Sequence, residues 1–273
     1  MGLNKKINSI KRRLKKFYPY EHCSLWLKIK VISVATIIKT FNRLVFPGVS
    51  LLNYMKKIYG IKNNKEFLSG YHKFKDGFDD KLWESRPRET KEAIESFYNE
   101  QENDVWRQVY LSEYDRDKKN YVLRICDLIH HFSKGKNVKI IDYGCGCGVF
   151  SQYLYKKGYK NITLADIKSG TLEFAKKAFG SNFKYIEINS GAPLKENYDI
   201  ILLIDVLAHA FNPFEVTRHV INHLNKDGLL VMNYEEGIFR THLKRAAEQK
   251  DKTMDYIYSK CRCLKENEVF IKI

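Results

Sequence analysis

The sequence has six cysteines in 273 residues but no C-x-x-C pair, the spacing on which zinc sites and thioredoxin-like redox sites are usually built. We therefore predict no metal site, and reduced thiols in a cytosolic protein are the plainer interpretation. A long apolar run is also missing. Between residues 24 and 46 the longest stretch without charge, Val31 to Ile38, falls far short of the ~20 residues that span a bilayer.

Acidic residues are scarce in the N-terminal third of the chain. Residues 1–81 hold 18 Lys and Arg against 5 Asp and Glu, whereas the remaining 192 residues hold 30 against 27. Most of the net charge of +16 therefore lies in the N-terminal region. A partner that recognises positive charge is expected to meet that region.

The first 17 residues lack the ordered apolar core and small-residue cleavage site of a secretory signal. Their apolar residues instead recur at steps of three and four, which predicts a basic amphipathic helix. These residues are Leu3, Ile7, Ile10, Leu14 and Phe17. Two interpretations stay open: residues 1–46 lie on an anionic membrane surface, or they form a helical subdomain with a solvated basic face. Nucleic acid is ranked lower as a partner, because no recognisable binding motif accompanies the charge.

The middle of the chain has a polar segment followed by helical patterns. Residues 60–90 are polar, with Gly and Pro, and are typical of a connector. A long helical pattern then runs from Thr90 to Val109, and a further helix is predicted from about Asn120 to Phe132.

From residue 138 onward, five apolar segments alternate with helical patterns. Such alternation predicts parallel βαβ units, and hence an α/β fold with a doubly wound, mostly parallel sheet. Ligands of such sheets bind at the carboxyl ends of the strands. Only 39 residues follow Tyr234, so we expect an abbreviated sheet in which "EVFIKI" is a single edge strand.

The segment "IIDYGCGCG" ends the first of these strands. Gly144, Gly146 and Gly148 alternate with other residues, and Asp142 precedes them. Glycines let a ligand approach the backbone closely, and a helix start offers free N–H groups. An acid inside the turn would repel pyrophosphate. The turn therefore suits a ligand that carries an ammonium group.

These residues resemble the class I S-adenosylmethionine-dependent methyltransferases, in their small-molecule branch. "IIDYGCGCG" matches the D/E-x-G-x-G-x-G motif of that family completely. "LADI", "DVLAHAFNP" and "LNKDGLLVMN" are similar to its later segments, and the resemblance covers about residues 120–240. It implies a Rossmann-like methyltransferase fold and S-adenosylmethionine as the cofactor.

The resemblance also implies roles at the first motif. Asp142 and the turn backbone at Gly144 and Gly146 would hold the amino-acid end of the cofactor. Gly148 would permit close packing of the helix on the strand.

Further roles follow at the ends of later strands. Asp166 would accept both ribose hydroxyls, and Ile167 would pack on the adenine. Asn189 stands where many relatives carry an acid that contacts the adenine amine. Asp205 and Val206 would border the methionine part of the cofactor and the mouth of the substrate site.

Simpler interpretations exist for several of these residues. Asp142 could merely cap the following helix, and Asp166 could be a solvated carboxylate at a strand end. His209 is a candidate general base, although a lone histidine after a strand is more often a structural hydrogen-bonding group. Cys145 and Cys147 occupy variable positions of the turn and are interpreted as small neutral side chains.

The predicted function is in-line methyl transfer to a small-molecule or lipid-linked acceptor, such as a sugar or a quinone-like headgroup. The Asn-Pro-Pro-Tyr type of motif for methylating nucleic acid bases is absent. Two alternatives stay open: a methyltransferase-fold protein that binds cofactor poorly and acts as a membrane-associated partner, and an RNA methyltransferase.

The chain is accordingly divided into three parts. Residues 1–60 form the basic amphipathic helical region, residues 61–118 a connector and helical substrate lid, and residues 119–273 the cofactor-binding domain. The expected location is the cytoplasm, with the inner face of the membrane as the site of any peripheral attachment.

Overall fold

The computed structural model describes residues 50–75, 83, 85–100, 104–188, 194–234, 243–265 and 268–273. The chain divides into two compact units, Met1–Gly48 and Val49–Ile273. The amphipathic helix predicted for residues 1–17 lies outside the described residues, and so does Asn189.

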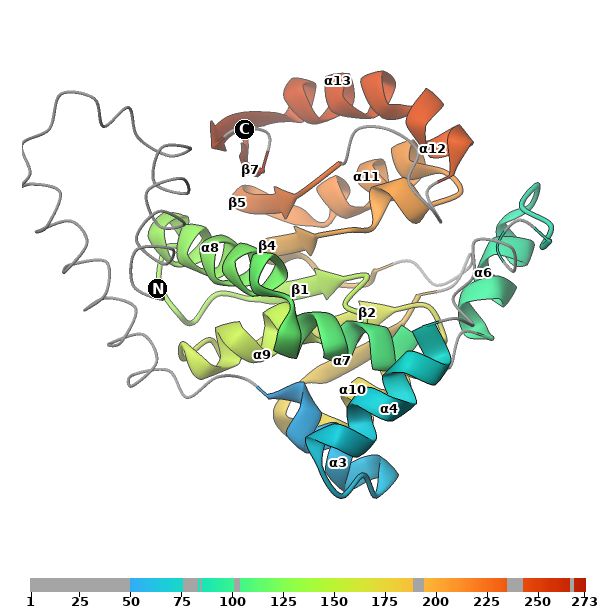
Figure 1. Cartoon of the computed structure of the whole chain (residues 1–273). Coiled ribbons are helices and arrows are strands. Elements are labelled where there is room, and N and C mark those ends of the chain that lie inside the picture. The colour runs from blue at the N-terminus through green and yellow to red at the C-terminus, as the bar shows by residue number, and fades with distance from the viewer. Residues whose placement is uncertain are drawn as a thin grey trace, which may run out of the picture. The chain divides into compact units, whose positions relative to one another are not determined.

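The described residues form a seven-stranded sheet with the order β3-β2-β1-β4-β5-β7-β6. The first five strands pair in parallel, and β7 runs antiparallel to both β5 and β6. The predicted doubly wound, mostly parallel sheet is therefore confirmed (Figure 1). The strands are β1 (Ile140–Tyr143), β2 (Ile162–Asp166), β3 (Lys184–Glu187), β4 (Tyr198–Leu203), β5 (Leu224–Met232), β6 (Cys261–Lys265) and β7 (Val269–Lys272).

The C-terminal end of the sheet corrects one expectation. The sheet is not abbreviated, because β6 and β7 complete it as an antiparallel pair. The segment "EVFIKI" supplies β7, which lies between β5 and β6 and is not an edge strand. The sequence "CRCLK" of β6 was hard to identify because an edge strand with two exposed residues lacks a clear apolar alternation.

Helices cover both faces of the sheet. Neighbouring residues of a strand point to opposite faces, so Ile140 belongs to one buried cluster and Ile141 to the other. The first cluster includes residues of α8 (Arg116–Phe132), α9 (Val149–Lys156) and α10 (Gly170–Phe179). The second includes residues of α11 (Pro213–Asn222) and α13 (Lys250–Lys260), and α12 (Lys244–Glu248) precedes α13.

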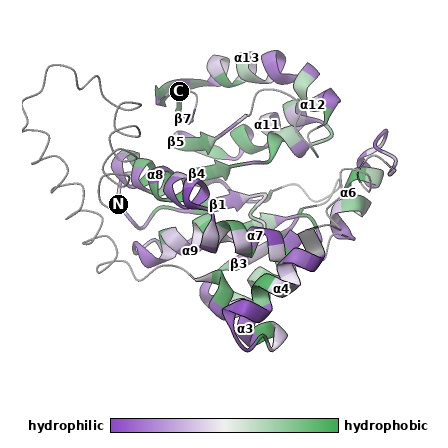
Figure 2. Cartoon of the chain, viewed as in Figure 1, coloured by the Kyte–Doolittle hydropathy of each residue, from purple (hydrophilic) through white to green (hydrophobic). Residues whose placement is uncertain are grey.

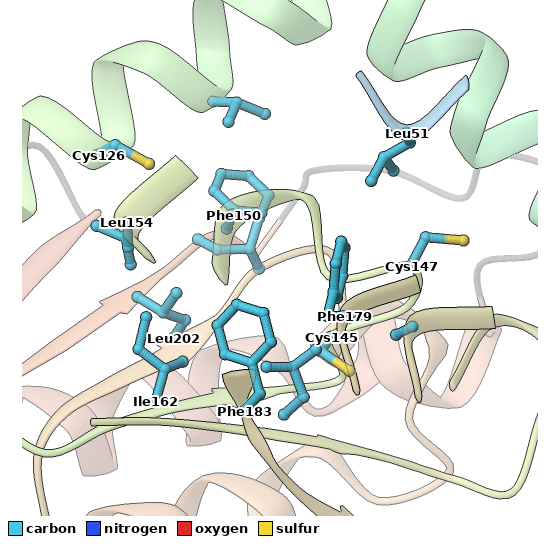
Figure 3. Close-up of a cluster of buried hydrophobic side chains, with 14 of the residues drawn as sticks. Leu51, Cys126, Cys145, Cys147, Phe150, Leu154, Ile162, Phe179, Phe183 and Leu202 are labelled. Carbon is cyan, nitrogen blue, oxygen red and sulfur yellow. The ribbon is translucent and has the colours of Figure 1, made fainter. Parts of the chain in front are cut away.

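The first cluster is centred on aromatic rings. Phe179 meets Phe183 edge to face with ring centroids 5.4 Å apart, and Phe183 meets Tyr155 in the same way at 5.3 Å. Figure 3 shows Phe150, Phe179 and Phe183 gathered with aliphatic side chains between the helices and the sheet. Figure 2 shows β4 and β5 as mainly hydrophobic and the surrounding helices as mixtures of hydrophobic and hydrophilic residues.

The region before the sheet is more helical than the sequence suggested. The expected connector at residues 60–90 contains α4 (Asn64–Lys75), whose Phe67 and Tyr71 are buried four residues apart. Gly70 is tolerated in this helix because a Cβ there would lie 2.5 Å from the ring of Trp106. Tertiary packing against a tryptophan therefore outweighs the low helix propensity of this segment.

The long helical pattern from Thr90 to Val109 is also corrected. It forms two helices, α6 (Lys91–Asn99) and α7 (Asp104–Tyr114). The side chain of Thr90 caps α6 by accepting from Ala93 N, and α6 closes at Glu100. Before them, α3 (Leu51–Tyr59) packs with α4 on α7 (Figure 1). Within the described part of the chain, no helix has the length and apolar character needed to cross a membrane.

Candidate functional site

A cavity of about 590 Å³ opens at the carboxyl ends of the parallel strands. Its walls come from the turn after β1, the ends of β2 and β4, and the helices α6, α7 and α11. Most of the site residues predicted from the sequence line it, and these are Asp142, Gly144, Gly146, Asp166, Ile167, Asp205, Val206 and His209.

The turn after β1 admits only glycine at two of its positions. Gly144 has φ +77° and Gly146 has φ +52°, values that favour glycine. A Cβ on Gly144 would lie 2.3 Å from Cγ2 of Val206, and one on Gly146 would lie 2.3 Å from Oε1 of Gln108. Glycine at these two positions therefore lets Val206 and Gln108 pack directly against the backbone of the turn.

Gly148 is placed differently, at the start of α9 behind the cavity. A Cβ there would lie 2.8 Å from Cδ2 of Leu164 and 2.9 Å from Cε2 of Phe179. This position lets α9 approach the sheet closely.

Asp166 ends β2 beside the glycine turn. Its Oδ2 accepts from Gly146 N at 2.6 Å and its Oδ1 accepts from Ile167 N at 2.8 Å. Burial raises the pKa of Asp166 to about 7, although these two backbone donors act to lower it. Each carboxylate oxygen can accept a second hydrogen bond, so the group can take two hydroxyl donors from a ligand.

Asp142 lies deeper, in the centre of the sheet. Its side chain is 3% exposed, and Oδ2 accepts from Ser151 Oγ, in α9, at 2.7 Å. Burial raises the pKa of Asp142 to about 6. The contact with Ser151 ties β1 to α9, so this acid contributes to the local fold as well as to the cavity wall.

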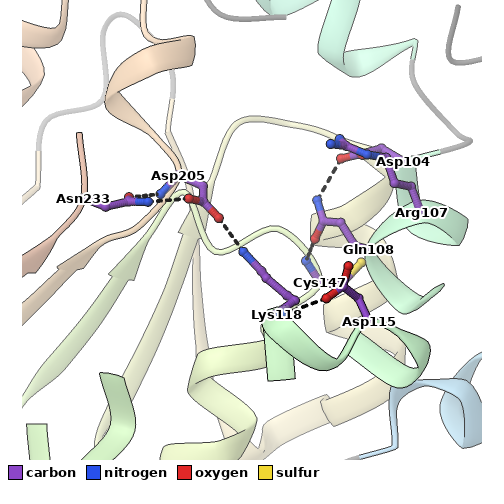
Figure 4. Close-up of polar contacts among 8 residues, drawn as sticks. All are labelled: Asp104, Arg107, Gln108, Asp115, Lys118, Cys147, Asp205 and Asn233. Atoms are coloured by element: carbon purple, nitrogen blue, oxygen red, sulfur yellow. Dashed lines mark hydrogen bonds and ion pairs between the residues drawn. The ribbon is translucent and has the colours of Figure 1, made fainter. Parts of the chain in front are cut away.

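Asp205 follows β4 and has φ +57°, which is uncommon for a residue other than glycine. A reciprocal pair of hydrogen bonds holds it, because Asp205 N donates to Asn233 Oδ1 and Asn233 Nδ2 donates to Asp205 Oδ1, both at 2.6 Å. Lys118 forms an ion pair with the same carboxylate (Figure 4). Burial alone would raise the pKa of Asp205, but the charge of Lys118 holds it below its ordinary value.

Lys118 is a site residue that the sequence did not reveal. It lies in the first turn of α8, and its ammonium group lies 5.6 Å from the ring centre of Tyr121 and 5.7 Å from that of Phe150. Lys118 lines the cavity, although 87 residues separate it from Asp205 in the sequence. No sequence motif marks it, because its role depends on the packing of α8 against the end of β4.

Gln108 of α7 is a second residue that the sequence did not reveal. Its Oε1 accepts from Cys147 N at 2.8 Å, and its Nε2 donates to Asp104 Oδ2 at 2.7 Å (Figure 4). Burial raises the pKa of Asp104, and Arg107 lies 3.6 Å from its other oxygen. Through Gln108, α7 is fixed directly to the glycine turn.

His209 lies in a short 3₁₀ turn, Leu207–His209, at the cavity wall. Its Nδ1 lies 2.9 Å from the hydroxyl oxygen of Tyr98, which comes from α6 and also lines the cavity. The sequence did not indicate Tyr98, because 111 residues separate the two.

Cys145 and Cys147 are buried in the turn, and burial raises the pKa of both thiols well above the ordinary range. They are therefore neutral at physiological pH, as the sequence analysis expected. Over the ranges that the structure describes, no group of three or more His, Cys, Asp or Glu side chains could hold a metal ion.

Comparison with known proteins decides the family. A family model described as a methyltransferase domain matches residues 134–270, about half of the chain. The chain belongs to this methyltransferase family. The resemblance to class I S-adenosylmethionine-dependent methyltransferases is thereby confirmed, and S-adenosylmethionine is the cofactor.

Curated relatives of this methyltransferase match at low identity. The ubiquinone biosynthesis O-methyltransferase of Rickettsia canadensis is 25% identical over 108 residues, which are 38% of this chain and 45% of the relative. The ribosomal RNA small subunit methyltransferase C of Psychromonas ingrahamii is 25% identical over 226 residues, 71% of this chain and 62% of the relative. The chain thus spans about half the length of the curated relatives that it matches.

Solved structures of similar shape include the magnesium protoporphyrin IX methyltransferase ChlM from Synechocystis. It is 16% identical, with a TM-score of 0.49, over 68% of this chain and 98% of that chain. The N-methyltransferase NodS from Bradyrhizobium japonicum is 15% identical, with a TM-score of 0.49, over 68% of this chain and 99% of that chain.

The residues around the glycine turn fit the cofactor of the family. The backbone of the turn lines the cavity at Gly144 and Gly146, and Asp166 retains acceptor capacity for two hydroxyls. Three carboxylates, those of Asp104, Asp142 and Asp166, line this part of the cavity and suit a ligand with cationic groups.

Proposed function

We propose that this methyltransferase transfers a methyl group to a hydroxyl group of a small-molecule or lipid-linked acceptor, sugar-like or quinone-like. One observation carries the proposal: a single cavity joins the glycine turn to His209, which is held by Tyr98. An oxygen nucleophile must lose a proton, and a histidine beside the acceptor can take it.

The cofactor would lie along the glycine turn. Asp166 would accept the two ribose hydroxyls, and Ile167 would flank the adenine with Asn189. The backbone at Gly144 and Gly146 would hold the amino-acid end, near Asp142. Bound S-adenosylmethionine supplies an activated sulfonium methyl group.

Asp205 and Val206 would border the boundary between cofactor and acceptor. The ion pair with Lys118 and the two hydrogen bonds with Asn233 fix the backbone there. A fixed boundary aligns the acceptor oxygen with the methyl group, and alignment is the main catalytic task when the methyl group is already activated.

His209 is proposed as the general base. Its Nδ1 faces Tyr98, and Nε2 is the ring nitrogen proposed to take the acceptor proton. For that direction of transfer, Nδ1 carries a proton and donates it to the hydroxyl oxygen of Tyr98. Tyr98 is therefore a positioning residue that orients the ring of His209.

The function is tested by incubating the protein with isotope-labelled S-adenosylmethionine and a panel of phenols, catechols, sugars and detergent-dispersed lipid quinols. A product heavier by one methyl group in place of hydrogen supports the proposal. Cofactor binding without transfer to any hydroxyl acceptor contradicts it. Absent cofactor binding favours the alternative of a membrane-associated partner protein that binds cofactor poorly. The RNA alternative, which the similarity to a ribosomal RNA methyltransferase supports, predicts RNA binding that weakens steeply with salt.

Replacing Asp166 with alanine is expected to weaken cofactor binding by about 1–3 kcal/mol, because two ligand hydroxyls lose a charged partner. Titration calorimetry at pH 8 measures the change, with Asp127→Ala as a control at an exposed carboxylate on the far end of α8. An affinity equal to that of the wild type would mean that the ribose is held elsewhere.

The pH dependence gives the same prediction a second measurement. With a pKa of about 7, Asp166 is largely protonated below pH 7 and must release its proton to accept both hydroxyls. Cofactor affinity is therefore expected to rise with pH up to about 7 and to level off above it. The Asp166→Ala variant should lose this dependence between pH 6 and 8, where Asp142, with a pKa of about 6, contributes little.

We further propose that residues 1–46 attach the protein to anionic membranes, as their basic amphipathic pattern suggests. Deleting them is expected to leave cofactor binding intact and to reduce sedimentation with phosphatidylglycerol vesicles. Added salt should also weaken attachment of the full chain, because exposed charges are screened over ~8 Å at physiological ionic strength. Full-length protein that stays in the supernatant at low salt would contradict this proposal.

A further inference from the structure

The corner between α3 and α4 gathers lysines around an exposed tyrosine. Residues 56–65, "KKIYGIKNNK", contain four lysines and no acid, and we call them the α3–α4 corner. Lys57, Lys62 and Lys65 are exposed, and Tyr59 is 48% exposed. Such a concentration of cations on a described helical surface lies outside the cavity and plays no part in the proposed transfer.

Local hydrogen bonds hold the corner in one conformation. The helix α3 ends at Gly60, with φ +69°, and Gly60 N and Ile61 N both donate to Lys56 O. This arrangement is a usual way to close a helix, and the buried Ile61 anchors the turn that follows.

The start of α4 is capped reciprocally. Glu66 N donates to Asn63 Oδ1 at 3.0 Å, while Lys62 N donates to Glu66 Oε2 at 2.8 Å. The one acid next to the corner is therefore engaged with the backbone. Because the backbone is fixed before any partner arrives, little conformational entropy is lost when the corner binds.

Tyr59 is supported from beneath. Its ring is nearly parallel to that of Phe174, at 6.5 Å between centroids, and tilted against that of Trp106, also at 6.5 Å. The ring is thus held at the surface with about half of the residue exposed. Tyrosine at the boundary between water and lipid is favoured, because the ring is apolar and its hydroxyl is polar.

We propose that the α3–α4 corner binds the headgroup layer of an anionic membrane, through Lys57, Lys62 and Lys65 and with Tyr59 at the interface. The inference rests on the membrane attachment proposed above and adds a contact made by the methyltransferase unit itself. Residues 50–75 carry six lysines and one acid, so their charge complements anionic lipid.

The shape of the corner favours a membrane over RNA. Figure 1 shows α3 and α4 at the outer edge of the described unit, with α7 between them and the sheet. A corner with one exposed ring can rest on a flat headgroup layer. Single-stranded RNA is held along grooves, where successive bases stack on several aromatic rings.

The position of α7 connects this surface with the cavity. Phe67 of α4 stacks on Trp106 of α7 at 5.4 Å, while Gln108 and Leu111 of α7 line the cavity. A membrane held at the corner would therefore be separated from the cavity by α4 and α7, about two helix layers or ~20 Å.

The test compares two full-length variants with the same change of charge. One carries Lys57→Glu, Lys62→Glu and Lys65→Glu, and the control carries Lys136→Glu, Lys195→Glu and Lys226→Glu at exposed sites elsewhere. Each variant is sedimented with vesicles of phosphatidylcholine and phosphatidylglycerol, and with vesicles of phosphatidylcholine alone. Binding of each variant to single-stranded RNA is measured as well. We expect the corner variant to bind anionic vesicles at least about tenfold more weakly than the control variant.

Several outcomes would overturn the inference. If the wild type sediments and both variants sediment equally, the corner is not the contact, while attachment through residues 1–46 still stands. If the wild type does not sediment, the membrane proposal fails as a whole, although methyl transfer is unaffected. If the corner variant loses only RNA binding, the surface recognises nucleic acid instead.

A matched substitution tests Tyr59 separately. Tyr59→Ser is expected to lower vesicle binding at high salt as well as at low salt, since a contact made by an apolar ring is not screened by ions. A thermal shift with S-adenosylmethionine checks that each variant is folded. Vesicle binding by a folded Tyr59→Ser variant equal to that of the wild type would remove the tyrosine from the proposed contact.

Discussion

The His209→Gln variant is expected to transfer methyl groups about 10²- to 10⁴-fold more slowly than the wild type, the range typical for loss of a general base. Glutamine preserves much of the size and polarity of histidine but cannot take up a proton at physiological pH. Cofactor affinity should not change. The measurement is the rate of methyl transfer at saturating cofactor, with the hydroxyl acceptor identified by the panel.

Tyr98→Phe provides the graded version of this experiment. Loss of one hydrogen bond to Nδ1 of His209 is expected to lower the rate about 5- to 10-fold and to shift its pH profile. The control is Tyr155→Phe, because the hydroxyl of Tyr155 donates to Asn182, away from the cavity.

Equal rates for His209→Gln and the wild type would exclude His209 as the base and favour an acceptor that needs no proton removed, such as a neutral amine.

Gly146→Ala is expected to reduce cofactor affinity by about 100-fold or more. A left-handed backbone costs roughly 1–2 kcal/mol for a residue with a Cβ. The new methyl group would also lie 2.3 Å from Oε1 of Gln108, which would have to leave Cys147 N. The glycine turn and α7 would both shift, and the backbone amide groups proposed to hold the cofactor would move with them.

Gly60→Ala separates the two contributions. Gly60 has φ +69° and ψ +20°, in the left-handed region, but a Cβ there meets nothing within 4 Å. Gly60→Ala should therefore lower the melting temperature through the backbone penalty alone and leave cofactor affinity unchanged. Calorimetric titration of both variants decides the point, and wild-type affinity in Gly146→Ala would show that the contact between Gln108 and the turn is not needed for cofactor binding.

The cofactor side of the site could be predicted largely from the sequence. The signal is local: a buried strand, a turn with glycines at fixed offsets and a helix start lie within "IIDYGCGCG" and the residues after it. The structure places Asp142, Gly144 and Gly146 at the cavity, as well as Asp166 at the end of the next strand. Backbone geometry at such a turn admits few residue types. The site can therefore be recognised from residues that are adjacent in the sequence.

Elements without such local constraint were harder to predict. The helix α4 contains Gly70 and a polar outer face, and its burial depends on Trp106 in another helix. The edge strand β6 has no alternation that distinguishes it from a loop. Both are stabilised by partners distant in sequence, which periodicity within one segment does not report.

The sequence by itself determined the α/β fold, the methyltransferase family and several of the carboxylates and glycines that line the cavity. The tertiary structure alone decided three contacts at the cavity: Lys118 with Asp205, Gln108 with Cys147, and Tyr98 with His209. They join residues 87, 39 and 111 positions apart. Each depends on where a helix before the sheet packs, and that placement is set by the summed burial of many side chains, which no single motif encodes.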